Sequence, residues 1–127
     1  MEKQNFFDLN FDQLSTFLIN NADVDVKKAK MRSQQLFNAV YKKNIKSFDE
    51  LTTFGIELRG KIKKLISLEK PKVVDTQKSK DGTIKFLLEL KDKRNVETVL
   101  IPDKTQSKYT ICLSVSVGCY LSCEFCA

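Results

Sequence analysis

Apolar side chains recur at helical spacing in the first half of this 127-residue chain and alternate with polar ones in the second half. The spacing predicts helices over residues 11–19, 26–41 and 56–66, with a further short helix after Ser47. Two capping boxes mark helix starts, one formed by Asn10 and Gln13 and the other by Ser47 and Glu50. We therefore expect a small helical domain over residues 1–70.

The second half predicts strands. Pro71 stops any preceding helix, and residues 72–92 form two strands around a Lys80-Asp81-Gly82 turn, a typical hairpin signal. A third strand is expected over residues 95–101, closed by Pro102, and a fourth over residues 108–117. In the fourth strand Cys112 falls on the face opposite the alternating apolar side chains. The fold class is therefore α+β, with a hairpin and linker strands over residues 71–107.

Composition limits the chemistry. Apolar residues make up 42% of the chain, enough for a folded core. The sequence shows neither a signal-peptide layout nor an apolar run long enough for a membrane span, so we expect a soluble, cytoplasmic protein that is not bound to a membrane. We also expect it to be a monomer. Histidine is absent, which excludes histidine-based acid–base catalysis and histidine metal ligands within these residues.

A basic stretch lies between Val26 and Phe48, where no acidic residue occurs although the net charge of the whole chain is only +6. Four of its residues cluster at the start of the second predicted helix: Lys27, Lys28, Lys30 and Arg32. They could contact the phosphates of an RNA, each contact adding salt-dependent affinity. The alternative is a solvated lysine-rich surface, which the pattern alone does not exclude.

All four cysteines lie in the last sixteen residues. Cys119, Cys123 and Cys126 have the spacing C-x3-C-x2-C, which suits three thiolates that hold three irons of a [4Fe-4S] cluster and leave the fourth iron open. Phe125 would place an apolar ring near the open position. The alternative is a structural zinc site with Cys112 as fourth ligand, in a small basic RNA-binding module without catalytic activity.

The cysteine spacing with its aromatic residue resembles the signature of the radical S-adenosylmethionine (SAM) superfamily. The flanking blocks "SKDGTIKFLLEL", "VETVLIP" and "CLSVSVGCYLSCEFCA" resemble the radical-SAM enzymes that methylate carbon 2 of adenosine in 23S ribosomal RNA and in tRNA. The segment "KMRSQQLFNAVYKKNIKSFDELTTFGIELRGKI" is similar to the helical accessory domain of that family, which helps to bind RNA. The resemblance covers nearly the whole chain.

The resemblance implies a role for each matched residue. Cys119, Cys123 and Cys126 match the cluster ligands, and SAM would bind the open iron next to Phe125. Cys112 matches a catalytic cysteine that takes the proton from carbon 2 and closes a disulfide with a second, methyl-carrying cysteine. Glu97 matches a glutamate assigned as proton acceptor. From the residues alone, Cys112 could equally be a bystander thiol, and Glu97 a solvent-facing strand carboxylate.

The resemblance also implies what else the enzyme needs. Reduction of the cluster calls for an external electron donor such as flavodoxin. Residues 108–127 would form the first strand and the cluster loop of a partial (β/α) barrel, whose later strands supply the remaining SAM contacts and the methyl-carrying cysteine. Because the sequence stops one residue after Cys126, we expect these 127 residues to be inactive alone.

Overall fold

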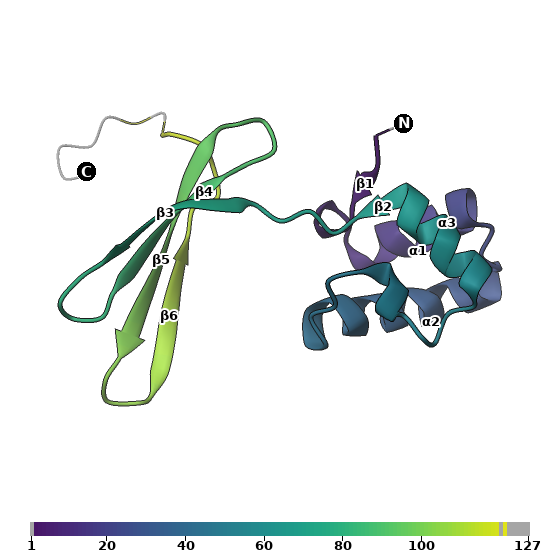
Figure 1. Ribbon diagram of the computed structural model, residues 1–127, viewed down its shortest axis with the longest axis horizontal. Coiled ribbons are helices and arrows are strands. Elements are labelled where there is room, and N and C mark those ends of the chain that lie inside the picture. Colours follow the sequence, from purple (N-terminus) through teal and green to yellow (C-terminus); the bar gives the residue numbers. More distant parts are fainter. Residues whose placement is uncertain (1, 120, 122–127) are drawn as a thin grey trace. The chain divides into compact units, whose positions relative to one another are not determined.

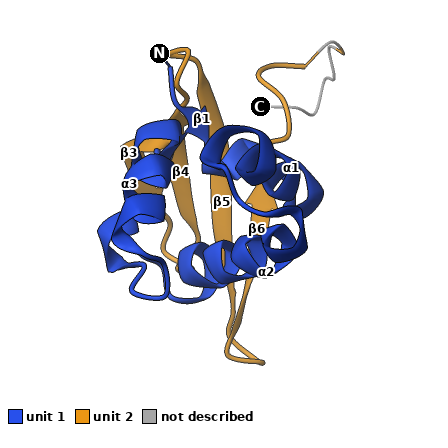
Figure 2. Cartoon of the chain, turned by 90° about the vertical axis from the view of Figure 1, so that its right-hand side faces the viewer, with its two compact units in different colours: residues 1–70 blue, residues 71–127 orange. Residues whose placement is uncertain are grey.

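The computed structural model describes residues 2–119 and 121, and it divides into two compact units, residues Met1–Lys70 and Pro71–Ala127 (Figures 1 and 2). The first unit is mainly helical, and the second is a sheet. Within the described part of the chain, no helix combines the length and the apolar character that crossing a membrane requires.

Unit 1 is built on three helices, α1 (Phe11–Ala22), α2 (Val26–Phe37) and α3 (Ile56–Leu65). The helix α2 continues into a wider π-helical turn, Asn38–Lys42, and two 3₁₀ turns cover Phe6–Asp8 and Phe48–Glu50. Two short strands, β1 (Gln4–Asn5) and β2 (Ile66–Ser67), pair in parallel and bring the two ends of the unit together. The pattern of apolar and polar positions did not predict this strand pair.

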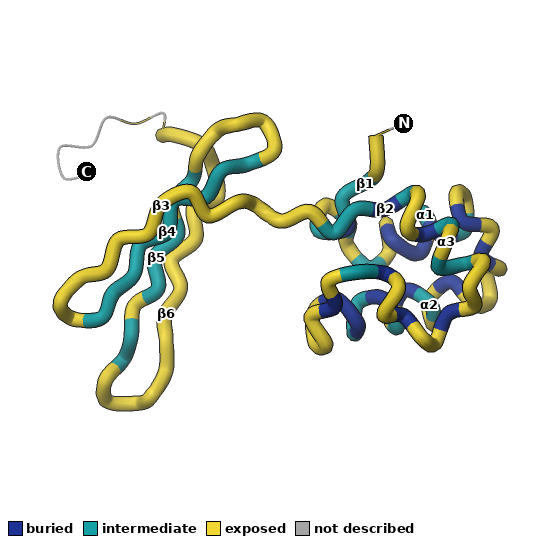
Figure 3. The backbone as a smooth tube through the Cα atoms, viewed as in Figure 1, coloured by how far each residue is buried: buried dark blue, intermediate teal, exposed yellow. Residues whose placement is uncertain are grey.

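The core of unit 1 lies between the three helices and the two 3₁₀ turns, and Figure 3 shows the buried positions along their inner faces. The most deeply buried large side chains include Phe6, Leu14, Leu18, Leu36, Ile62 and Ile66. One polar contact crosses this core: the Ser15 hydroxyl on α1 lies 2.9 Å from the Ser33 hydroxyl on α2. Because each hydroxyl satisfies the other, the two helices approach closely there without leaving a polar atom unpaired.

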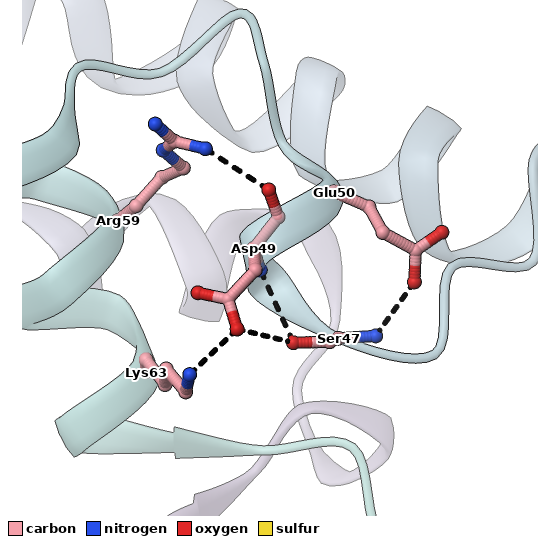
Figure 4. Close-up of polar contacts among 5 residues, drawn as sticks. All are labelled: Ser47, Asp49, Glu50, Arg59 and Lys63. Carbon is pink, nitrogen blue, oxygen red and sulfur yellow. Dashed lines mark hydrogen bonds and ion pairs between the residues drawn. The ribbon is translucent and has the colours of Figure 1, made fainter.

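Both predicted capping boxes are confirmed. The second joins two elements (Figure 4): the Ser47 amide donates to Glu50, and the Asp49 carboxylate accepts from Lys63 of α3 at 2.6 Å. The Arg59 guanidinium, also on α3, donates to the Asp49 carbonyl at 2.9 Å. The hydrogen bond from Lys63, and after it the one from the Ser47 hydroxyl, lowers the pKa of Asp49 below its ordinary value.

Unit 2 is an antiparallel sheet in which four described strands follow one another in chain order. They are β3 (Lys72–Lys78), β4 (Ile84–Glu89), β5 (Asn95–Asp103) and β6 (Lys108–Leu113). The expected turn joins β3 to β4, with Gly82 at φ +94° and a Cβ position only 3.2 Å from Pro102, which favours glycine there.

Two strand boundaries differ from expectation. We predicted that Pro102 closes the third strand, but β5 runs through it to Asp103, and Pro102 lies opposite Tyr109 in the register. We predicted a fourth strand to Val117, but β6 ends at Leu113, and the next residue, Ser114, bonds to the Glu97 carbonyl through both its amide and its hydroxyl. The assignment of β6 to a barrel remains a prediction, and here it pairs antiparallel with β5.

Replacing Asn10 with Ala should lower the stability of the chain by about 1 kcal/mol, the usual value of a lost N-cap. The Asn10 side chain accepts from the Gln13 amide at 2.9 Å, and the Gln13 side chain accepts from the Asn10 amide at 2.9 Å. Urea unfolding followed by circular dichroism measures the change. The control is Asn20→Ala at an exposed position inside α1, which should leave stability unchanged or slightly higher.

Replacing Asp49 with Asn should destabilise the chain at neutral pH and have progressively less effect as the pH falls below 3.8, the ordinary aspartate pKa. Because folding lowers the pKa of Asp49, the ion pair contributes stability above the unfolded pKa and loses it as the carboxylate is protonated. Urea midpoints measured across this pH range test the prediction. Lys63→Met should show the same convergence, and a pH-independent difference would contradict it.

Candidate functional site

The register between β5 and β6 places Cys112 and Glu97 on one face of the sheet. Cys112 lies opposite Val99 in the antiparallel ladder, and paired residues share a face. Glu97 is two residues before Val99 and therefore lies on the same side. Both side chains are exposed, so a ligand could reach the thiol and the carboxylate from the same direction.

Lys85 extends this group, and the sequence analysis missed it. Its position on β4 lies opposite Val99, so Lys85, Val99 and Cys112 form one row across three strands. The Lys85 ammonium lies 3.4 Å from the Glu97 carboxylate, and this ion pair is partly exposed to solvent. The turn at Gly82 fixes the register of β4 against β3 only, whereas the contact depends on the register between β4 and β5, which the sequence analysis did not predict.

Ser114 connects this face to the cysteine loop. Its hydroxyl donates to the Glu97 carbonyl oxygen at 2.6 Å, and its amide donates to the same oxygen at 3.3 Å. The chain therefore leaves β6 from a point fixed against Glu97. Gly118, with φ +75°, then turns the backbone just before Cys119.

The cysteine loop is described only at its start. Cys119 is exposed, and its sulfur accepts a hydrogen bond from the Leu121 amide at 3.4 Å. Cys123, Phe125 and Cys126 lie outside the described residues, and within residues 2–119 and 121 no three acidic or cysteine side chains come together as a metal site. The Cys119 environment fits a thiolate ligand, since amide hydrogen bonds to sulfur are among the features that tune cluster sites.

The predicted phosphate contacts all lie within the first seven residues of α2. Lys27, Lys28 and Lys30 are exposed. Asp25 caps the helix through the Lys27 amide at 2.7 Å, but the first turn itself holds no acidic residue. Positive charge at a helix N-terminus opposes the helix dipole, so helix stability does not account for these lysines.

Arg32, unlike Lys27, Lys28 and Lys30, has side-chain contacts with the loop before α3. Its guanidinium donates to the Gln35 side chain at 3.0 Å and to the Thr53 carbonyl at 3.2 Å, and it lies 5.0 Å from the centre of the Phe54 ring. These contacts hold α2 against the loop that precedes α3. The structure thus gives Arg32 a packing role within unit 1, and its contact with RNA remains a prediction.

A cavity of about 430 Å³ adjoins this end of α2. Its charged lining is balanced, with Asp23, Asp25 and Glu57 facing Lys28, Arg32 and Lys61. Lys61 is already paired with Asp23 at 2.7 Å, which lowers the pKa of Asp23 and raises that of Lys61. A polyanion would therefore meet less net positive charge inside the cavity than on Lys27 and Lys30, which do not line it.

The helical unit of the chain matches a known protein family. Residues 4–68 match the family described as the ribosomal RNA large subunit methyltransferase N-terminal domain. The match covers just over half of the chain, and the chain belongs to this family.

The relatives agree with this assignment. The chain is 41% identical over 119 residues to the dual-specificity RNA methyltransferase RlmN of Oleidesulfovibrio alaskensis, covering 94% of this chain and 32% of the relative. It is 36% identical over 134 residues to RlmN of Campylobacter fetus, covering 97% and 35% of the two chains. The chain spans about a third of the length of the curated relatives it matches.

A solved structure supports the same class. The crystal structure of a radical SAM methyltransferase from Sphaerobacter thermophilus superposes with a TM-score of 0.76 at 28% identity. The match covers 97% of this chain and 34% of that one. The fold is therefore shared with a radical SAM methyltransferase over nearly all of these residues.

Replacing Lys27, Lys28 and Lys30 together with Gln should weaken RNA binding and reduce the slope of log affinity against log salt by about two, since each lost phosphate contact removes about 0.7–0.9. Fluorescence anisotropy of a labelled RNA stem-loop at several salt concentrations measures both quantities.

The matched control is Lys72, Lys78 and Lys80 replaced with Gln, which changes the net charge equally at exposed positions in unit 2. A salt slope reduced equally in both triple variants would show a general charge effect and contradict a specific contact surface on α2.

Proposed function

We propose that this chain forms the amino-terminal part of a radical-SAM methyltransferase that methylates carbon 2 of adenosine in 23S rRNA and tRNA. The observation that carries the proposal is the shared face of Glu97 and Cys112, on strands that lead directly into the cysteine loop. Family membership supports the RNA substrate, and the named activity of the relatives supports methyl transfer.

Cys119, Cys123 and Cys126 are the proposed ligands of a [4Fe-4S] cluster, with SAM at the remaining iron and Phe125 beside it. When bound, the cluster and SAM supply the one-electron chemistry that activates a methyl group for transfer to an unreactive carbon. The electron comes from an external donor such as flavodoxin. For this role the chain must keep Cys119 as a thiolate, to which the Leu121 amide contributes a hydrogen bond.

The roles proposed for Glu97 and Cys112 follow from their exposure on one face. Glu97 is an acceptor for the proton that leaves carbon 2 of adenine, and Lys85 holds its carboxylate through the ion pair at 3.4 Å. In this proposal the base is joined to the methyl-carrying cysteine through a methylene group when the Cys112 sulfur attacks the sulfur of that cysteine. The disulfide bond forms as the bond between that sulfur and the methylene carbon breaks. The electron pair goes to the departing carbon, which takes up a proton and becomes the methyl group of the released base. The resemblance also implies that Cys112 takes the proton from carbon 2. Glu97 and Cys112 would then be alternative acceptors for that proton.

Unit 1 is the proposed RNA-binding part. Its exposed lysines at the start of α2 carry charge that helix stability does not explain, which suits contact with the phosphates of a folded RNA. We propose that the protein works as a cytoplasmic monomer, as the sequence predicted.

Anaerobic reconstitution of the chain with iron and sulfide should give about four irons per chain and the broad visible absorbance of a cluster. Cys119→Ala should abolish both signals because it removes a ligand. Cys112→Ala should retain both because Cys112 is assigned to catalysis.

The zinc alternative predicts the reverse. One zinc per chain after aerobic purification, lost in Cys112→Ala, together with failure to assemble a cluster, would contradict the proposed function. Elemental analysis of the native chain, Cys119→Ala and Cys112→Ala separates the two outcomes.

A further inference from the structure

Five aromatic rings gather at the carboxyl end of α2, and neither the capping patterns nor the proposed methyl-transfer site uses them. Phe37 and Tyr41 are 5.3 Å apart, Phe6 lies 5.4 Å from Phe37, and Phe11 lies 5.6 Å from Phe37. Phe7 completes the group at 6.0 Å from Tyr41 in an edge-to-face arrangement. These centroid distances are those of favourable aromatic packing.

Tyr41 is held firmly but remains accessible. Its ring contacts Phe6, Phe7 and Phe37, yet the residue is 55% exposed. It lies in the π-helical turn Asn38–Lys42, a deviation from α-helix that is frequent at functional sites. An aromatic side chain that its neighbours already orient loses little conformational entropy when a ligand stacks on it.

The surroundings of this ring are basic. The Lys70 ammonium lies 5.6 Å from the centre of the Phe7 ring and donates to the Asn44 side chain at 3.2 Å. Lys42 and Lys43 are exposed directly after Tyr41. No acidic residue occurs between Val26 and Phe48, the stretch that contains Tyr41, although Asp8 and Asp12 directly follow Phe7 and Phe11 and Glu69 precedes Lys70.

We propose that Tyr41, Phe7 and Lys70 form a stacking platform for one unpaired base of the RNA substrate. Tyr41 supplies the surface on which the base stacks, and Phe7 supports Tyr41 from the side. Lys70, with Lys42 and Lys43, faces the phosphates that flank that nucleotide. Aromatic residues with adjacent cations are the usual means of binding single-stranded nucleic acid. The proposal rests on the proposed function, because it takes the substrate to be RNA.

The platform would give unit 1 a selectivity that lysines alone do not provide. The lysines at the start of α2 contact phosphates, which are present in paired and unpaired RNA alike. A ring that stacks on a base requires the base to be out of the duplex. Unit 1 would then recognise a loop or bulge next to a helical stem.

The test uses the whole 127-residue chain and two probes, a short single-stranded RNA carrying 2-aminopurine and the same strand annealed to its complement. Tyr41→Ala should weaken binding to the single strand about tenfold, the typical value of one base–aromatic stack. It should leave duplex affinity and the salt slope unchanged. Tyr41→Phe should bind like the native chain, because stacking needs the ring and not the hydroxyl.

Tyr41→Leu provides a second variant that fills the site with apolar volume but has no ring, and circular dichroism reports whether each variant folds. Tyr109→Ala is the matched control, since Tyr109 in unit 2 is similarly exposed at 66%. The native chain should also quench the 2-aminopurine fluorescence on binding, which tests the platform without any substitution.

The outcomes separate the two proposals. One outcome is that the native chain binds RNA with the expected salt dependence while Tyr41→Ala and Tyr41→Leu bind equally well. This result refutes the platform but keeps RNA as the partner. A protein surface that covers Tyr41 in place of a base would give this result. Equal losses for both probes would refute stacking in favour of phosphate contact. If the native chain binds neither probe, RNA binding by unit 1 fails together with the platform.

Discussion

The antiparallel pairing of Val99 with Cys112 is the constraint on which the proposed chemistry depends. A shift of one residue between β5 and β6 would send Cys112 to the opposite face and separate it from Glu97. Two further contacts hold Glu97, and the first of them also joins the end of β6 to β5. Ser114 bonds to the Glu97 carbonyl at the end of β6, and Lys85 pairs with the Glu97 side chain from β4. The acid and the thiol are thus positioned by backbone geometry.

The features that the sequence predicted correctly depend on neighbouring residues. The capping boxes at Asn10 and Ser47 join residues three positions apart, and the turn at Gly82 requires only a local positive φ. Family membership was also recognisable, because the helical block and the cysteine loop are continuous stretches of sequence. For the site, alternation placed Cys112 on the polar face of its strand, but the roles of Cys112 and Glu97 came only from the resemblance.

The features that the sequence did not reveal depend on distant partners. The β1–β2 pair joins residues more than sixty positions apart, and no local pattern identifies such a contact. The apolar alternation continues to Val117, but β6 ends at Leu113, and the Ser114 hydroxyl bonds to the Glu97 carbonyl beside the Ser114 amide. The ion pair of Lys85 and the ring cluster around Tyr41 likewise require knowledge of which segments meet. In each case the contact depends on how distant segments pack together, which the periodicity of apolar residues does not predict.

The hydroxyl contact between Ser15 and Ser33 has a consequence for how this family can change over time. Losing the Ser15 hydroxyl would leave the fully buried Ser33 hydroxyl without this partner, whereas losing the Ser33 hydroxyl would leave Ser15 its bond to the Phe11 carbonyl oxygen at 3.1 Å. Losing both together in favour of small apolar side chains would remove the polar requirement altogether. A polar residue at position 33 should therefore occur among relatives together with a polar residue at position 15, whereas position 15 can be polar by itself.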